Sequence, residues 1–131
     1  MLSSARAYHG RMNDTVLIVD DHSTFRSFAR ELLEADGFRV VGESGDGASA
    51  VEAARTLRPD VVLLDVQLPD FNGFEVAGRL RAAGVESLIV LVSSRDASDY
   101  GDDIASSGAA GFVPKGELSG SALRALLAEV S

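Results

Sequence analysis

Val61-Val62-Leu63-Leu64-Asp65 is the stretch of this sequence that says most about its fold, and Val66-Gln67-Leu68-Pro69 follows it directly. A continuous apolar run of this length predicts a β-strand that is buried on both faces, as strands of parallel sheets are. Asp65 then lies at the carboxyl end of its strand, where open α/β sheets bind their ligands. A second run of the same kind, Val16-Leu17-Ile18-Val19, ends in Asp20-Asp21. The sequence therefore predicts a cluster of carboxylates at the ends of two strands.

Strand and helix patterns alternate along the chain from residue 15 onward. We expect strands over residues 15–19, 39–42, 61–64, 88–92 and 111–114. We expect helices over residues 23–35, 48–57, 73–82, 96–106 and 119–130, of which 96–106 is the weakest because Gly101 lowers helix propensity. Apolar side chains of the first and last helices are expected to share one side of each helix; they are Phe25, Phe28, Leu32 and Leu33, and Leu123, Leu126, Leu127 and Val130.

This alternation predicts an α/β fold with a doubly wound, five-stranded parallel sheet and five helices, of the flavodoxin-like kind. Pro114 cannot donate a ladder hydrogen bond, so the fifth strand should be an edge strand. The strand order 2-1-3-4-5 meets this condition and places the topological switch point between strands one and three. These are the two strands that end in Asp20 and Asp65.

Composition limits the classes of protein that the chain can be. It has 131 residues, 46% of them hydrophobic and 24% charged, which suits one globular domain over residues 14–131. Residues 1–13 are polar and without pattern, and we expect a disordered leader or an artificial extension. The net charge of −8 argues against nucleic-acid binding by this chain, and no apolar stretch approaches the roughly 18 residues of a membrane span. The absence of cysteine fits a cytoplasmic protein.

Polar side chains at four strand ends suggest a specific chemistry. Oxygen ligands such as those of Asp20, Asp21 and Asp65 suit Mg²⁺, which commonly binds through a few carboxylates and a substrate phosphate. Lys115 supplies a point charge for a phosphoryl oxygen, and Ser93 supplies a hydroxyl that can donate to another. Asp65 is then the nucleophile that forms an aspartyl phosphate.

The motifs that carry these residues resemble those of response-regulator receiver domains, the phospho-acceptor half of bacterial two-component signalling. The resemblance covers residues 16–130. It rests on four segments in order, with Gly73 eight residues after Asp65: Val19-Asp20-Asp21, Leu64 to Pro69, Leu91-Val92-Ser93-Ser94 and Gly111-Phe112-Val113-Pro114-Lys115. Each segment is weak evidence alone, but the set at this spacing is specific.

The resemblance implies that a histidine kinase or a phosphotransfer protein phosphorylates Asp65. It implies that Asp21 and Asp65 hold Mg²⁺ directly, that Asp20 acts largely through water, and that the backbone carbonyl of Gln67 is a further ligand. Lys115 and Ser93 would bind the phosphoryl group. Phe112 would be the aromatic switch that turns inward when Ser93 moves.

The segment around Lys115 is most similar to that of receivers with a helix-turn-helix output domain. This similarity implies control of transcription through a protein contact, and not turnover of external substrates. We expect that contact to be a homodimer formed on phosphorylation, because Leu123, Leu126, Leu127 and Val130 of the last helix offer more apolar surface than packing on the sheet covers. Two positions depart from the usual pattern. Gly116 stands where many receivers have proline, and Ser94 stands where alanine or glycine is more usual.

Two other functions compete with this interpretation. A phosphohydrolase of the haloacid dehalogenase type also uses a strand-end aspartate and Mg²⁺, but it needs an acid two residues later, where this chain has Gln67. A receiver that works without phosphorylation, as an interaction module, is the other alternative. His22 is expected to be exposed and not to be a ligand, because hard cations prefer oxygen.

Overall fold

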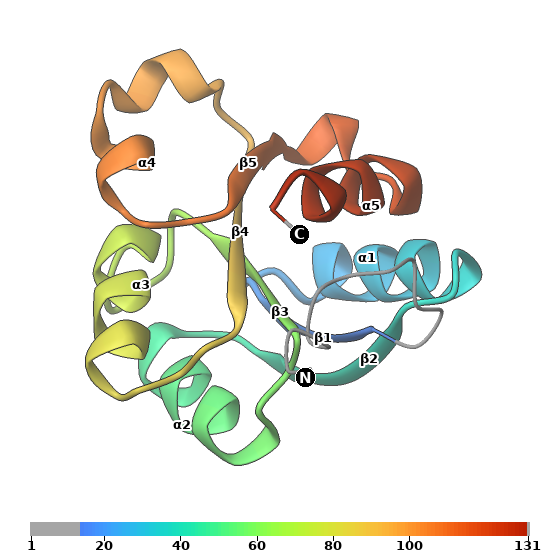
Figure 1. Ribbon diagram of the computed structural model, residues 1–131, viewed down its shortest axis with the longest axis horizontal. Coiled ribbons are helices and arrows are strands. Elements are labelled where there is room, and N and C mark those ends of the chain that lie inside the picture. The colour runs from blue at the N-terminus through green and yellow to red at the C-terminus, as the bar shows by residue number, and fades with distance from the viewer. Residues whose placement is uncertain (1–13, 131) are drawn as a thin grey trace.

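The computed structural model describes residues 14–130 as a five-stranded parallel sheet with helices on both faces (Figure 1). The strand order is β2-β1-β3-β4-β5, as the sequence predicts. The strands are β1 (Thr15–Val19), β2 (Arg39–Ser44), β3 (Val61–Asp65), β4 (Leu88–Ser93) and β5 (Gly111–Pro114). The expected leader over residues 1–13 lies outside the described residues.

The helices form two layers, one on each face of the sheet (Figure 1). One layer contains α1 (Ser23–Ala35) and α5 (Gly120–Glu129). The other contains α2 (Gly47–Leu57), α3 (Gly73–Ala82) and the short α4 (Asp103–Ser106). Two apolar clusters fill the spaces between these layers and the sheet. Alternate residues of β1 serve the two clusters, with Val16 and Ile18 in the first and Leu17 and Val19 in the second.

The edge position of β5 follows from Pro114. This strand pairs with β4 alone, and Pro114 lies opposite Ser93 at the carboxyl end of that pair. The central strand β3 is buried along its whole length between β1 and β4, which explains its unbroken apolar run. The carboxyl ends of β1, β3, β4 and β5 therefore meet at one edge of the sheet.

The expected helix over residues 96–106 is wrong as a continuous element. The structure has a 3-10 turn, η2 (Ala97–Tyr100), followed by α4, which has four residues. Gly101 separates them with φ 57°, a left-handed conformation that a regular helix cannot accommodate and that glycine adopts at little cost. A second 3-10 turn, η3 (Lys115–Glu117), follows β5.

Phe28, which was expected to face the core, is exposed instead, and Val130 is also exposed. The side of α1 that faces the sheet is centred on Ala29 and Leu33, which are fully buried. Phe28 lies beside this stripe and is 51% exposed, with its ring against that of Phe25. Helix α5 ends at Glu129, and Val130 beyond it is 43% exposed. Within residues 14–130, no helix is long and apolar enough to cross a membrane.

Candidate functional site

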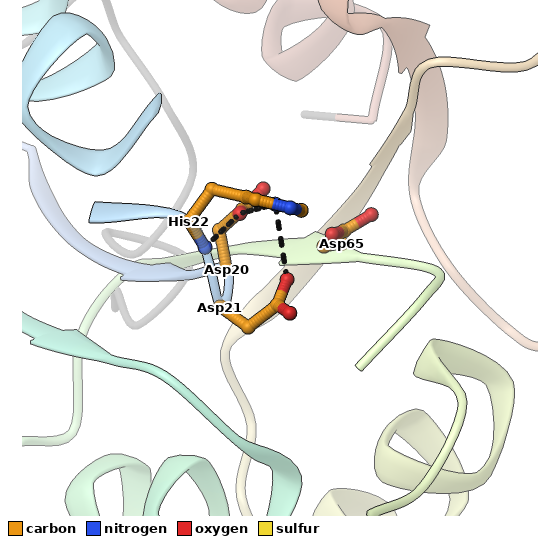
Figure 2. Close-up of side chains that lie close together, drawn as sticks. All are labelled: Asp20, Asp21, His22 and Asp65. Atoms are coloured by element: carbon orange, nitrogen blue, oxygen red, sulfur yellow. Dashed lines mark hydrogen bonds and ion pairs between the residues drawn. The ribbon is translucent and has the colours of Figure 1, made fainter. Parts of the chain in front are cut away.

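Three predicted carboxylates gather at the carboxyl edge of the sheet (Figure 2). Strands β1 and β3 are neighbours, and Val19 lies opposite Leu64, so the residues that follow them come side by side. Oxygen atoms of Asp20, Asp21 and Asp65 and a ring nitrogen of His22 all lie within 4.8 Å of one another. This is the geometry that the sequence predicts for the three aspartates.

Asp65 is the most constrained of these acids. It ends β3, is 3% exposed, and accepts a hydrogen bond from the backbone N–H of Gln67 at 3.2 Å. Burial and the nearby charge of Asp20 raise the pKa of Asp65 to about 6, although Gln67 and Lys115 oppose the rise. An ionised Asp65 is thus costly in this pocket, and a cation bound beside it would remove part of that cost.

Lys115 reaches the same pocket from the start of η3, just after the edge strand. Its Nζ atom lies 2.6 Å from Oδ2 of Asp20 and 3.4 Å from Oδ2 of Asp65. Burial lowers the pKa of Lys115, but its contacts with the two carboxylates outweigh burial and raise it overall. The ammonium group also lies 4.5 Å from the centre of the Phe25 ring. A charged lysine is therefore held at the position where a group attached to Asp65 would meet it.

Asp20 and Asp21 differ in their surroundings. Asp20 is fully buried, and its two carboxylate oxygens already contact Lys115 and the backbone N–H of His22. The side chain of Asp21 is 36% exposed, and its Oδ1 lies 3.1 Å from Nδ1 of His22. Asp21 is thus better placed than Asp20 to give an oxygen to a cation.

His22 is exposed, as the sequence analysis expects, but it lies beside the acidic pair (Figure 2). Its side chain is 70% exposed, and Nδ1 lies 3.2 Å from Oδ1 of Asp20 and 3.1 Å from Oδ1 of Asp21. The ring thus contacts two predicted ligand residues. The sequence signal for this contact is adjacency, since His22 directly follows Asp20-Asp21.

Gln67 lies in the exposed turn after β3, with its backbone N–H directed to Asp65. The turn is closed by a bridge between Gln67 and Asn72. The carboxylates of this edge, with no thiolate among them, form a donor set that fits Mg²⁺. The residues present therefore fit the ion that the sequence predicts.

Ser93 ends β4 and is fully buried, but its hydroxyl is engaged elsewhere. Ser93 Oγ lies 2.5 Å from the hydroxyl oxygen of Tyr100 and accepts a hydrogen bond from the backbone N–H of Arg95 at 3.0 Å. The role of Tyr100 was not predicted from the sequence. The available signal was an aromatic ring in a strongly acidic segment, but nothing in the sequence shows that its hydroxyl reaches Ser93.

Phe112 lies in β5 opposite Leu91 of β4, on the sheet face that carries the second apolar cluster. Its side chain is partly buried against this cluster. The ring centre is 6.0 Å from that of Tyr100. Tyr100 thus connects the two residues: its hydroxyl contacts Ser93, and its ring lies next to that of Phe112.

Comparison with known proteins gives consistent results. Residues 16–128 match the sequence profile of the family described as response regulator receiver domain. The chain is 38% identical over 101 residues to the DNA-binding transcriptional activator EvgA of Escherichia coli, covering 77% of this chain and 50% of EvgA. It is 38% identical over 106 residues to the Bordetella pertussis protein BvgA, with coverage of 81% and 51%. The chain thus spans about half the length of these curated relatives.

Solved structures agree with the fold. The crystal structure of a two-component response regulator of the LuxR family from Aurantimonas superposes with a TM-score of 0.79 at 30% sequence identity. This superposition covers 88% of the present chain and 85% of that one.

Proposed function

The chain belongs to the response regulator receiver domain family, and from this premise we propose that it is a Mg²⁺-dependent phospho-acceptor whose acceptor residue is Asp65. One observation supports the proposal most strongly: three carboxylates and the ammonium group of Lys115 converge at one edge of the sheet. Three carboxylates and one ammonium group leave an excess of negative charge, which is costly in a buried pocket unless a cation balances it.

In the proposed reaction, a carboxylate oxygen of Asp65 attacks the phosphorus of a phosphohistidine on a histidine kinase or a phosphotransfer protein. A P–O bond forms as the P–N bond breaks, and the histidine nitrogen leaves with the electron pair of that bond. The ammonium group of Lys115 lies 3.4 Å from Asp65, so it can bind an oxygen of the new phosphoryl group. Its contact with Asp20 weakens as it does so. A hydroxyl of Ser93 that rotates toward the same group donates a second hydrogen bond.

When bound at this site, Mg²⁺ would supply positive charge next to the phosphoryl oxygens. We assign direct ligation to Asp21 and Asp65, with the backbone carbonyl of Gln67 as a further ligand. Asp20 acts through water in this assignment, because its oxygens are occupied by Lys115 and the backbone of His22. Gln67 also leaves the position two residues after Asp65 without an acid, which disfavours the phosphohydrolase alternative.

The output proposed for the domain is a change in protein contact. Movement of the Ser93 hydroxyl toward the phosphoryl group is coupled to an inward turn of Phe112, a two-state repacking of neighbouring strands. EvgA is named as a DNA-binding transcriptional activator. We propose that this receiver likewise controls transcription in the cytoplasm, through a helix-turn-helix output domain that binds the DNA, with homodimer formation on phosphorylation.

Labelling with a small acyl-phosphate donor tests the proposal and the ligand assignment together. The wild-type protein should take up phosphate with Mg²⁺ and not with EDTA. Asp21→Asn should weaken Mg²⁺ binding more than Asp20→Asn. Loss of a carboxylate that acts through water, such as Asp20, should cost about tenfold in metal affinity, and loss of a direct ligand such as Asp21 should cost more. Undiminished labelling in EDTA would refute the metal requirement, and a larger effect at Asp20 would reverse the assignment.

A further inference from the structure

Tyr100 makes a contact that the proposed switch of Ser93 and Phe112 does not include. Its hydroxyl oxygen lies 2.5 Å from Oγ of Ser93, and either atom can be the donor. Ser93 is fully buried, and the backbone N–H of Arg95 already donates to the same oxygen. The hydroxyl of Ser93 is therefore held by two partners on the segment that follows β4, and not by the acidic pocket.

The ring of Tyr100 ties this segment to two other elements. It packs edge-on against Phe74 of α3, with ring centres 5.6 Å apart, and lies 6.0 Å from the ring of Phe112 in β5. Tyr100 is the last residue of η2, whose start is fixed by a capping box between Asp96 and Asp99. Gly101 follows with a left-handed φ of 57°. Tyr100 is thus the anchored end of a short, otherwise exposed turn.

The Ser93 hydroxyl has two competing partners: Tyr100 in the present structure and a phosphoryl oxygen in the phosphorylated protein. A phosphoryl oxygen on Asp65 is an acceptor, so Ser93 can bind it only by directing its single hydroxyl hydrogen toward the acidic pocket. A rotation of the side chain that achieves this moves Oγ away from Tyr100. The present O–O distance is 2.5 Å. A change of the Ser93 side chain to another staggered rotamer carries Oγ out of hydrogen-bond reach of Tyr100.

We propose that Tyr100 is a positioning residue that holds the Ser93 hydroxyl in the unphosphorylated protein and releases it when Asp65 carries a phosphoryl group. The inference rests on the proposed function of Asp65. We call the hydrogen bond between Ser93 of β4 and Tyr100 of η2 the latch. It acts in addition to the aromatic contact between Tyr100 and Phe112. Release of the latch frees Tyr100, and with it η2, to change position against α3 and β5.

Tyr100→Phe tests the latch, because this substitution keeps the ring and removes only the hydroxyl. Loss of one neutral hydrogen bond that stabilises only the resting state should tighten binding of beryllofluoride, a phosphoryl mimic, by about 3- to 10-fold in the presence of Mg²⁺. The matched control is Ser98→Ala, which removes an exposed hydroxyl from the same turn and should leave the affinity unchanged.

A double-mutant cycle separates the latch from a general effect on the turn. In the Ser93→Ala background, Tyr100→Phe should no longer change the affinity for beryllofluoride, because its partner hydroxyl is gone. An undiminished effect in that background would show that Tyr100 does not act through Ser93. Unchanged or weaker binding by Tyr100→Phe in the wild-type background would likewise overturn the latch.

Tyrosine fluorescence can distinguish a response of Tyr100 to phosphorylation from a purely structural role of this residue. The chain has no tryptophan and two tyrosines, so Tyr8→Phe leaves Tyr100 as the single fluorescent tyrosine. Mg²⁺ and beryllofluoride at saturation should change the emission of Tyr100 in this protein and not in its Ser93→Ala variant. An equal change in both would overturn the latch. Absence of beryllofluoride binding by the wild type would overturn the proposed function itself.

Discussion

Among the individual residues, Asp65 has the clearest electrostatic consequence. Its pKa is raised to about 6 from an ordinary value of 3.8, chiefly because it is buried. A carboxyl group with a raised pKa in the folded state is harder to ionise there than in the unfolded chain. The folded protein therefore loses stability as the pH rises from about 4 to about 6, and the loss persists at neutral pH.

Asp65→Asn should accordingly stabilise the metal-free protein at pH 7.5, by an amount on the order of 1–3 kcal/mol in the free energy of unfolding. Near pH 4 the gain should be much smaller, because Asp65 is then protonated in the folded protein. Urea denaturation in EDTA at the two pH values measures this difference. The exposed Asp102→Asn is the matched control and should change little at either pH. Equal stability of wild type and Asp65→Asn at pH 7.5 would contradict the electrostatic account.

The acidic residues were predictable because Asp20-Asp21 and Asp65 follow short apolar runs whose length and β-branched residues favour a buried strand. Lys115 was predictable from its place after the edge strand. The contact between Tyr100 and Ser93 was not, because it depends on how η2 folds back after β4. The exposure of Phe28 was missed for a related reason. Periodicity shows that a helix has an apolar side, but the neighbouring helix and sheet decide how wide a stripe is covered.

Among the elements, α3 shows how closely a helix must approach the site. The backbone N–H of Gly73 donates to the carbonyl of Val66, which directly follows β3. A Cβ atom at Gly73 would lie 2.6 Å from the backbone oxygen of Asp65 and 2.8 Å from Cα of Val66. Real Cβ atoms do not approach backbone this closely, so the first turn of α3 can stay against Asp65 only with glycine there.

Gly73→Ala should therefore destabilise the protein by about 1–3 kcal/mol and reduce phosphate labelling of Asp65, since the backbone must move to relieve the clash. Gly78→Ala is the control within the same helix, because a Cβ atom there would meet nothing within 4 Å. That substitution should stabilise α3 by about 0.5–1 kcal/mol. Thermal unfolding of both variants tests the pair, and similar effects of the two substitutions would refute the close-approach argument.

The strand order was predictable because Pro114 restricts β5 to an edge, and the doubly wound order 2-1-3-4-5 meets this condition. The same order places the strands that end in Asp20 and Asp65 side by side, which is an independent agreement. The segment after β4 was harder to predict. Its acidic residues and capping candidates favour a helix, and Gly101 disfavours one, so local propensity is nearly balanced. The break into η2 and α4 then depends on tertiary contacts such as the ring of Tyr100 against Phe74.

At the scale of the whole molecule, the proposed output is a change in association. The described surface exposes Phe28, Leu57 and Val130, whereas Leu123 and Leu127 of α5 are used in the core. The apolar surface available to a partner is thus smaller than the sequence of α5 suggests. Self-association should be weak without a phosphoryl group and should depend on the switch.

Sedimentation velocity with and without Mg²⁺ and beryllofluoride tests this dependence. The protein should sediment as a monomer alone and shift toward a dimer with the phosphoryl mimic. Asp65→Asn is the control and should stay monomeric under both conditions. A monomer under all conditions and over a broad concentration range would rule out self-association and leave binding to a different protein as the output.

The central claim is that Asp65 accepts the phosphoryl group, and locating the phosphate tests it most directly. After labelling with a small acyl-phosphate donor and Mg²⁺, trypsin should release residues 56–79 as one peptide, since Arg58 precedes Pro59. This peptide contains Asp60 and Asp70 as well as Asp65, so fragmentation by mass spectrometry can distinguish the three. We predict a base-labile phosphate on Asp65 alone and none in Asp65→Asn. Phosphate on another residue, or equal labelling of Asp65→Asn, would contradict the account.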